Sequence, residues 1–185
     1  MFGLGLNRLR RLAALPFMLE RGRLTKRYPP AVREKVQAWC SIIDPIMDAP
    51  GEETRERLIE VAGIDDGEEL LFGLVHENPG CKLLSADKTA MRALRNAPQL
   101  QDVHASLCGR VACLESVLLA LLEMAGTHTV IHAVGLVRPY NIMLNSVFSR
   151  GTETPLAECQ AGLSSYIQHL RSEVGASFLV DFARP

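Results

Sequence analysis

The sequence predicts a helix-rich α/β domain with a short parallel sheet. Two short apolar runs, CKLLS (81–85) and GRVACLE (109–115), are each followed by a segment with the apolar spacing of a helix. Strands that alternate with helices in this way favour parallel pairing, with right-handed crossovers that cover the sheet. A length of 185 residues and a hydrophobic content of 48% suffice for one sizeable core.

The N-terminal part of the chain predicts helices joined by a basic connector. Segment 6–15 has the pattern of an amphipathic helix that Pro16 stops. Segment 31–47 has apolar residues at helical spacing, and Pro45 disturbs its last turn. A charged helix is expected over 52–61.

The middle of the chain alternates between helix and strand. Asp65 or Asp66 is expected to cap a helix whose acidic first turn suits the helix dipole, and Asn78-Pro79-Gly80 ends that helix. The elements expected next are a strand over 81–85, a helix over 88–96, a strand that begins after Gly109 and a helix over 116–124.

Two further helices and a short edge strand complete the expected fold. The helices cover 130–148 and 156–174, and the strand covers 177–182. We expect one domain over 1–185, in which a basic helical part (1–50) precedes an α/β core (51–126) and a helical C-terminal part (127–185). Whether the chain forms a homo-oligomer is left open.

Cysteine spacing and hydropathy point to a cytoplasmic protein. The five cysteines form no C-x-x-C pair and no zinc-like spacing with the histidines, so we expect reduced and mostly buried thiols. No run of about 18 apolar residues is present, and we therefore expect no membrane span.

Charge is unevenly distributed although the net charge is only −1. Up to residue 35 the chain has nine Lys/Arg and two Glu, a balance of +7, and the remainder has a balance of −8. A basic segment of this kind suits a polyanion, and the alternative is a solvated basic helix with carboxylate neighbours. An arginine-rich start is also typical of a mitochondrial transit peptide, although few hydroxyl residues are present.

Two neighbouring segments carry a family resemblance. DDGEELLFGL (65–74) and LLSADKTAMRAL (83–94) resemble the D-x-G-E-A helix and the following strand, L-L-T-x-D-[KR], of PIN-like domains. GRVACLE resembles the strand that comes next in such proteins. The match extends from Ile64 to Glu115.

The resemblance implies a three-layer fold and a metal-dependent nuclease. PIN-like domains place a parallel sheet between helices, and the active ones cleave single-stranded RNA with Mg²⁺ or Mn²⁺ held by three or four carboxylates. Glu68 corresponds to the second carboxylate and Asp87 to the third, which makes both metal ligands and catalytic residues, with Asp65 as a helper at the metal. Glu69 is expected to face solvent. The basic residues expected to contact RNA are Arg21, Arg23, Lys26 and Arg27.

The sequence departs from the family pattern at two of four acidic positions. A first strand that ends in aspartate is not found, and Thr89 stands where a fourth carboxylate often occurs. We therefore expect a natural strand upstream of Met1. The alternatives are a strand donated by a partner chain, or a smaller sheet in a degenerate module that binds nucleic acid or protein without catalysis. Glu68 and Asp87 also have structural alternatives, because an acid stabilises a helix N-terminus and aspartate is a preferred N-cap.

Overall fold

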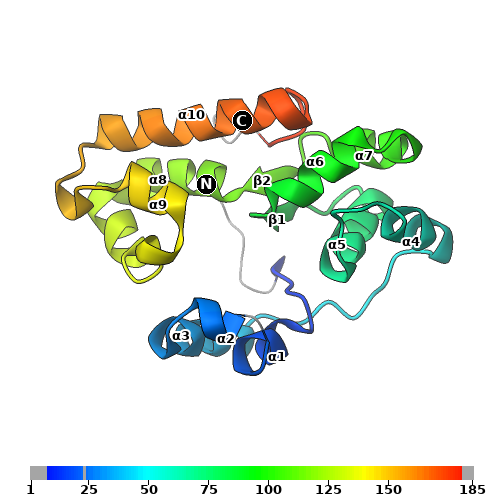
Figure 1. Cartoon of the computed structure of the whole chain (residues 1–185), viewed down its shortest axis with the longest axis horizontal. Coiled ribbons are helices and arrows are strands. Elements are labelled where there is room, and N and C mark those ends of the chain that lie inside the picture. Colours follow the sequence, from blue (N-terminus) through cyan, green and yellow to red (C-terminus); the bar gives the residue numbers. More distant parts are fainter. Residues whose placement is uncertain (1–7, 23, 181–185) are drawn as a thin grey trace. The chain divides into compact units, whose positions relative to one another are not determined.

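The structure of the chain is a computed structural model, which describes residues 8–22 and 24–180. The protein is mostly helical (66%) and contains a two-stranded parallel sheet, in agreement with the expected mixed α/β class. Contacts divide the chain into two compact units (Figure 1). Unit 1 comprises 1–48 and 133–149, and unit 2 comprises 49–132 and 150–185. The single domain with boundaries at 50 and 126 stays a prediction.

Short helices make up the described part of unit 1. They are α1 (Leu15–Glu20), α2 (Leu24–Arg27), α3 (Pro30–Cys40) and α9 (Ile142–Val147). The prediction of a helix over 6–15 is wrong for the described residues, because α1 begins where that helix was expected to end; residues 6 and 7 lie outside them. Pro16 is in the first turn of α1, where its missing N–H costs no hydrogen bond.

The segment after α3 is extended rather than helical. Arg11 and Pro45 form an isolated parallel bridge, in which Arg11 N–H donates to the Asp44 carbonyl at 3.2 Å and Ile46 N–H donates to the Arg11 carbonyl at 2.8 Å. The Arg11 guanidinium also donates to the Cys40 carbonyl at the end of α3, at 3.0 Å. The expected helix over 31–47 therefore stops at Cys40, because proline cannot continue the hydrogen-bond ladder.

Unit 2 holds both strands and the longer helices. Its first helices are α4 (Glu52–Ile59), α5 (Asp66–Glu77), α6 (Lys88–Asn96) and α7 (Gln101–Leu107). The strands are β1 (Leu83–Ser85) and β2 (Val111–Cys113). The last helices are α8 (Leu114–Val134) and α10 (Leu156–Val174). Residues 133 and 134 of α8 are assigned to unit 1. The α7 helix was not predicted. The helix expected over 130–148 is interrupted by a 3₁₀ turn, Arg138–Tyr140.

The two strands pair in parallel, as expected. Leu83 lies opposite Val111, and Ser85 lies opposite Cys113. The C-terminal segment adds an isolated bridge between Leu179 and Val111 on the other side of β2, with Val180 N–H donating to the Val111 carbonyl at 2.8 Å. Within the described residues the expected edge strand over 177–182 is reduced to this bridge.

Helices and strands of unit 2 share one apolar core. Phe72 of α5, Val111 of β2, Leu94 of α6 and Phe178 of the C-terminal segment are completely buried, and Leu170 of α10 is almost so. Figure 1 shows α6 and α10 in the part of the molecule that contains the strand pair. Complete burial of a large apolar side chain stabilises a fold by about 1.5–3 kcal/mol, so this core holds both strand ends in place.

The α8 helix is apolar and contains a break. By length and composition it is the one described helix that could cross a membrane. Its most apolar 18-residue stretch has a mean hydropathy of 1.5, and 28% of that stretch is buried in the protein. Gly126 has φ 78° and ψ 162°, which divides the helix into 114–125 and 127–134. Neither piece has the roughly 20 residues that a helix needs to span a lipid bilayer. The absence of a membrane partner stays a prediction.

All five cysteines are free thiols, and three of them are buried. This agrees with the thiol state expected from their spacing. The cytoplasmic location inferred from it stays a prediction.

Candidate functional site

Acidic residues follow both strands at the same edge of the sheet. Asp87 lies two positions after Ser85, the last residue of β1, and Glu115 lies two positions after Cys113, the last residue of β2. Because the strands are parallel and Ser85 is paired with Cys113, their carboxyl ends meet at one edge. Open α/β sheets bind ligands at this edge.

Asp65 and Glu68 form a capping box at the start of α5. The Asp65 carboxylate accepts from Gly67 N–H at 2.9 Å and from Glu68 N–H at 3.1 Å, and the Glu68 carboxylate accepts from Asp65 N–H at 2.9 Å. These contacts satisfy helix N–H groups that have no partner within the helix. Both residues therefore have a structural role that needs no metal.

Asp87 is the N-cap of α6. Its Oδ1 atom accepts from Thr89 N–H at 2.9 Å and from Ala90 N–H at 3.0 Å, while its own N–H donates to Ser85 Oγ at 3.0 Å. The capping alternative considered for Asp87 is thus present in the structure. An ionised carboxylate has about four acceptor sites, so two cap bonds leave capacity for another contact.

The Glu68 carboxyl has a strongly raised pKa. Burial raises this pKa from its ordinary value of 4.5 to about 7, and a side-chain hydrogen bond with Asp65 and the negative charges of Asp65 and Asp87 act in the same direction. The hydrogen bond from Asp65 N–H opposes them. Because the charge of Asp87 contributes to the Glu68 pKa, these two predicted metal ligands interact electrostatically.

These carboxyl groups suit a weakly held Mg²⁺ better than an enclosed metal site. Within residues 8–22 and 24–180, no group of three or more His, Cys, Asp or Glu side chains is arranged to hold a metal ion. Mg²⁺ often keeps several waters and takes one or two carboxylates together with phosphate oxygens. Glu68 and Asp87 provide donors of this kind. A cation at these carboxylates would also offset the smaller part of the Glu68 pKa shift that comes from the negative charges of Asp65 and Asp87.

Glu115 and Lys88 form a buried ion pair that the sequence analysis did not single out. Lys88 Nζ lies 2.5 Å from Glu115 Oε1 and 5.2 Å from the centroid of the Tyr166 ring. The Glu115 side chain is 3% exposed, and its Oε2 atom is buried with no hydrogen-bond partner. The signal was available in the sequence, because Glu115 follows β2 at the same spacing as Asp87 follows β1.

Glu69 does not face solvent. It is 3% exposed and accepts a hydrogen bond from Arg55 Nε of α4 at 2.8 Å. The expectation for this residue was therefore wrong: Glu69 links α5 to α4, and an arginine on another helix compensates its buried charge.

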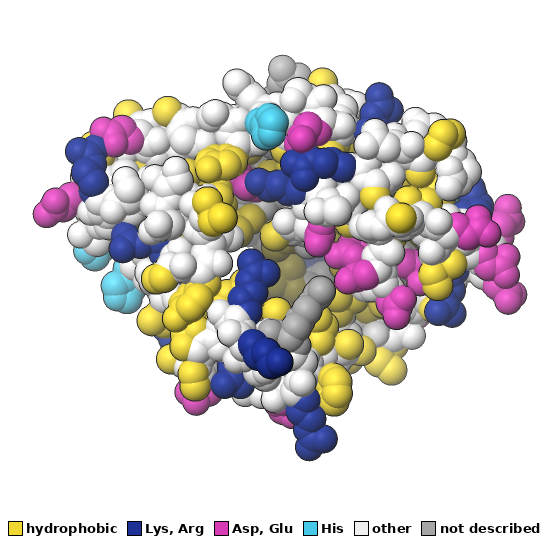
Figure 2. Space-filling view, in the orientation of Figure 1, with side chains coloured by type: hydrophobic (Ala, Val, Ile, Leu, Met, Phe, Trp, Pro, Cys, Tyr) yellow, Lys and Arg dark blue, Asp and Glu magenta, His cyan; other side chains and the backbone are white. Residues whose placement is uncertain are grey.

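The basic residues predicted to contact RNA belong to unit 1. Arg21, Lys26 and Arg27 are exposed, and Arg23 lies outside the described residues. Arg27 lies over the Tyr28 ring, with 5.5 Å between its guanidinium carbon and the ring centroid. Basic side chains lie over the α1–α3 region in Figure 2, and acidic side chains gather over α4 and α5. Exposed basic and aromatic side chains are the groups that single-stranded nucleic acid contacts.

No protein-family model, curated protein or solved structure matches the chain. The PIN-like resemblance therefore remains a proposal supported by the residues themselves.

Proposed function

We propose that unit 2 contains a three-layer PIN-like fold and that the protein is a ribonuclease dependent on Mg²⁺ or Mn²⁺. The observation that carries the proposal is the position of Asp87 just past the carboxyl end of β1 in the parallel strand pair, together with the raised pKa of Glu68, to which the charge of Asp87 contributes. The negative charge of Asp87 disfavours ionisation of Glu68, in addition to the larger effects of burial and of the hydrogen bond with Asp65. Such an arrangement is costly without a cation and is common at functional sites.

Each residue has a role in this proposal. Glu68, as the ionised carboxylate, and Asp87, at the end of β1, would hold the cation, while Asp65 keeps the Glu68 side chain in position through the capping box. When bound, the metal lowers the pKa of a water molecule and polarises the scissile phosphate. Arg21, Lys26 and Arg27 attract the RNA backbone electrostatically.

The activity test compares charge-removing variants that keep the helix caps. Single-stranded RNA labelled at its 5′ end is incubated with the purified chain in EDTA, Mg²⁺ or Mn²⁺. We expect cleavage only with a divalent ion. Asp87→Asn should lower the rate by about 100-fold or more, because it removes a charge at the reacting centre but retains an N-cap.

Asp66→Asn is the matched control for Asp87→Asn. Asp66 is an exposed acid in the first turn of α5 and is not assigned to the cation. It should leave cleavage unchanged. Equal cleavage by wild-type protein and Asp87→Asn would reject the proposed role of Asp87.

RNA binding is tested separately from cleavage. Affinity for a single-stranded RNA should fall as the salt concentration rises. Replacing Arg21, Lys26 and Arg27 by Gln should reduce the slope of log K against log salt by about 2. Each phosphate that the protein no longer neutralises accounts for about 0.7 of this change. Arg171→Gln in α10 provides a control outside unit 1. Binding that does not depend on salt would leave the three residues as ordinary surface groups.

A second candidate is a PIN-like module that binds nucleic acid without catalysis. The observation that favours it is the engagement of Asp65, Glu68 and Asp87 in helix caps, which gives each of them a structural reason to be present. Salt-dependent RNA binding without cleavage in either metal would select this candidate.

A further inference from the structure

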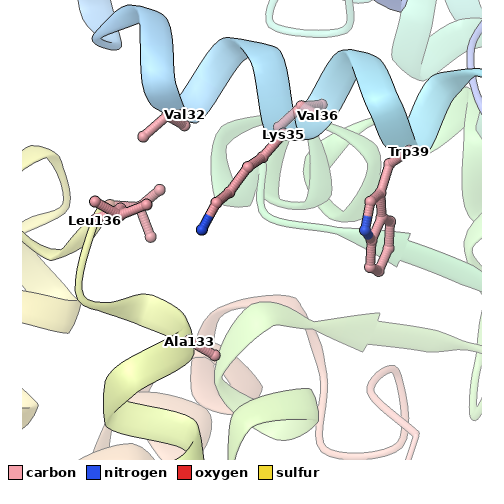
Figure 3. Close-up of a pocket in the computed structure, with 7 residues that line it drawn as sticks. Val32, Lys35, Val36, Trp39, Ala133 and Leu136 are labelled. Atoms are coloured by element: carbon pink, nitrogen blue, oxygen red, sulfur yellow. The ribbon is translucent and has the colours of Figure 1, made fainter.

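Unit 1 contains a largely apolar pocket that the proposed nuclease activity does not use. It has a volume of about 220 Å³ and is lined by α3 and by the segment 133–137. Figure 3 shows side chains of α3 that extend toward Ala133 and Leu136. The lining residues are Val32, Lys35, Val36, Trp39, Ala133, Leu136 and Val137.

Among the described residues that line the pocket, Lys35 alone carries a charge. In Figure 3 its ammonium group reaches into the space between α3 and the segment 133–137. Among the ion pairs of the described residues, none involves Lys35. The surrounding unit is also basic, with ten Lys/Arg and four Asp/Glu in 1–48 and 133–149. An ammonium group over apolar walls therefore favours an anionic ligand.

The apolar lining determines the rest of the ligand. Trp39 is 63% exposed and Leu136 is 45% exposed, so a ligand that covers them removes apolar surface from water. This gain is about 25 cal/mol for each Å². With a volume of about 220 Å³, the pocket has room for a small molecule.

We propose that this pocket binds a small amphipathic monocarboxylate with a short apolar chain. The carboxylate pairs with Lys35, and the apolar part lies against Trp39 and the aliphatic side chains. A phosphodiester or a free phosphate would leave the apolar walls exposed. One compact ammonium group matches one carboxylate.

Trp39 provides a direct readout of binding, because it is the only tryptophan of the chain. The purified full-length protein is titrated with octanoate, 1-octanol and inorganic phosphate while tryptophan emission is recorded. We expect octanoate to shift the emission to shorter wavelength in a saturable manner, because the exposed indole ring loses water. Octanol should bind about tenfold more weakly, and phosphate should cause no shift.

Variants at two lysines identify the source of the preference. Lys35→Met should lower octanoate affinity about tenfold while octanol still binds, and Lys35→Arg should retain the preference for octanoate. Lys82→Met is the control, since Lys82 is an exposed lysine that does not line the pocket. Retained octanol binding also shows that the variant is folded.

Two results would overturn the proposal. One is the absence of a saturable emission shift with octanoate in the wild-type protein. The other is an unchanged preference for octanoate over octanol in Lys35→Met, which would show that Lys35 does not recognise the carboxylate.

Discussion

Glu68→Gln should change how stability depends on pH. In the folded protein the Glu68 pKa is about 7, against an ordinary value of 4.5. Between these values the folded protein keeps a proton that the unfolded chain has released. The contribution of Glu68 to the unfolding free energy of the wild-type protein therefore falls as pH rises from 4.5 to 7. Above pH 7 this contribution is at its lowest.

The magnitude follows from the size of the pKa shift. One pKa unit corresponds to about 1.4 kcal/mol, so the difference between 4.5 and about 7 is worth about 3.5 kcal/mol at most. About 2–3 kcal/mol is expected for a side chain that keeps some contact with water. Glutamine cannot ionise, but it can still accept from Asp65 N–H in the capping box. Relative to the wild-type protein, Glu68→Gln should thus gain about 2–3 kcal/mol between pH 4 and pH 8.

Urea denaturation followed by far-ultraviolet circular dichroism at pH 4 to 8 measures this difference. Asp66→Asn is the control, because it removes an acid from the same helical turn. The difference between each variant and the wild-type protein cancels the contributions of other titrating groups. A constant difference between Glu68→Gln and wild-type protein across the pH range would refute the raised pKa.

Further variants at three positions test the packing around the candidate site by urea denaturation. Asp87→Ala should lose about 1 kcal/mol and Asp87→Asn almost nothing, because asparagine also caps a helix; equal losses would argue against the cap. Lys88→Met should lose about 3 kcal/mol at pH 7, since it leaves the Glu115 carboxylate buried and unpaired; a loss below about 1 kcal/mol would argue against that pairing. Gly73→Ala should lose about 1–3 kcal/mol, because an added Cβ would lie 2.6 Å from Pro50 Cβ; an unchanged midpoint would show that this contact relaxes freely.

Local signals predicted several elements closely. The helices expected over 88–96 and 156–174 have those bounds in the structure, and α5 begins after an expected N-cap, Asp65. Caps and apolar periodicity involve residues only a few positions apart, so the sequence carries this information directly. By contrast, α7 has only seven residues, which is too short for a clear periodic pattern.

Proline was interpreted wrongly at one position because its effect depends on where the helix begins. Pro16 was expected to end a helix and instead lies in the first turn of α1. The same residue type ends a helix or starts one, and neighbouring contacts determine which occurs.

For the candidate site, the sequence alone determined which carboxylates stand at the starts of α5 and α6, because capping is local. Only the tertiary structure decided that Glu69 pairs with Arg55 and that Glu115 is buried against Lys88. It also decided that Asp87 acts on the pKa of Glu68. These contacts join separate elements, and their energies depend on distance and burial, which the packing of the helices and strands sets and sequence spacing does not encode.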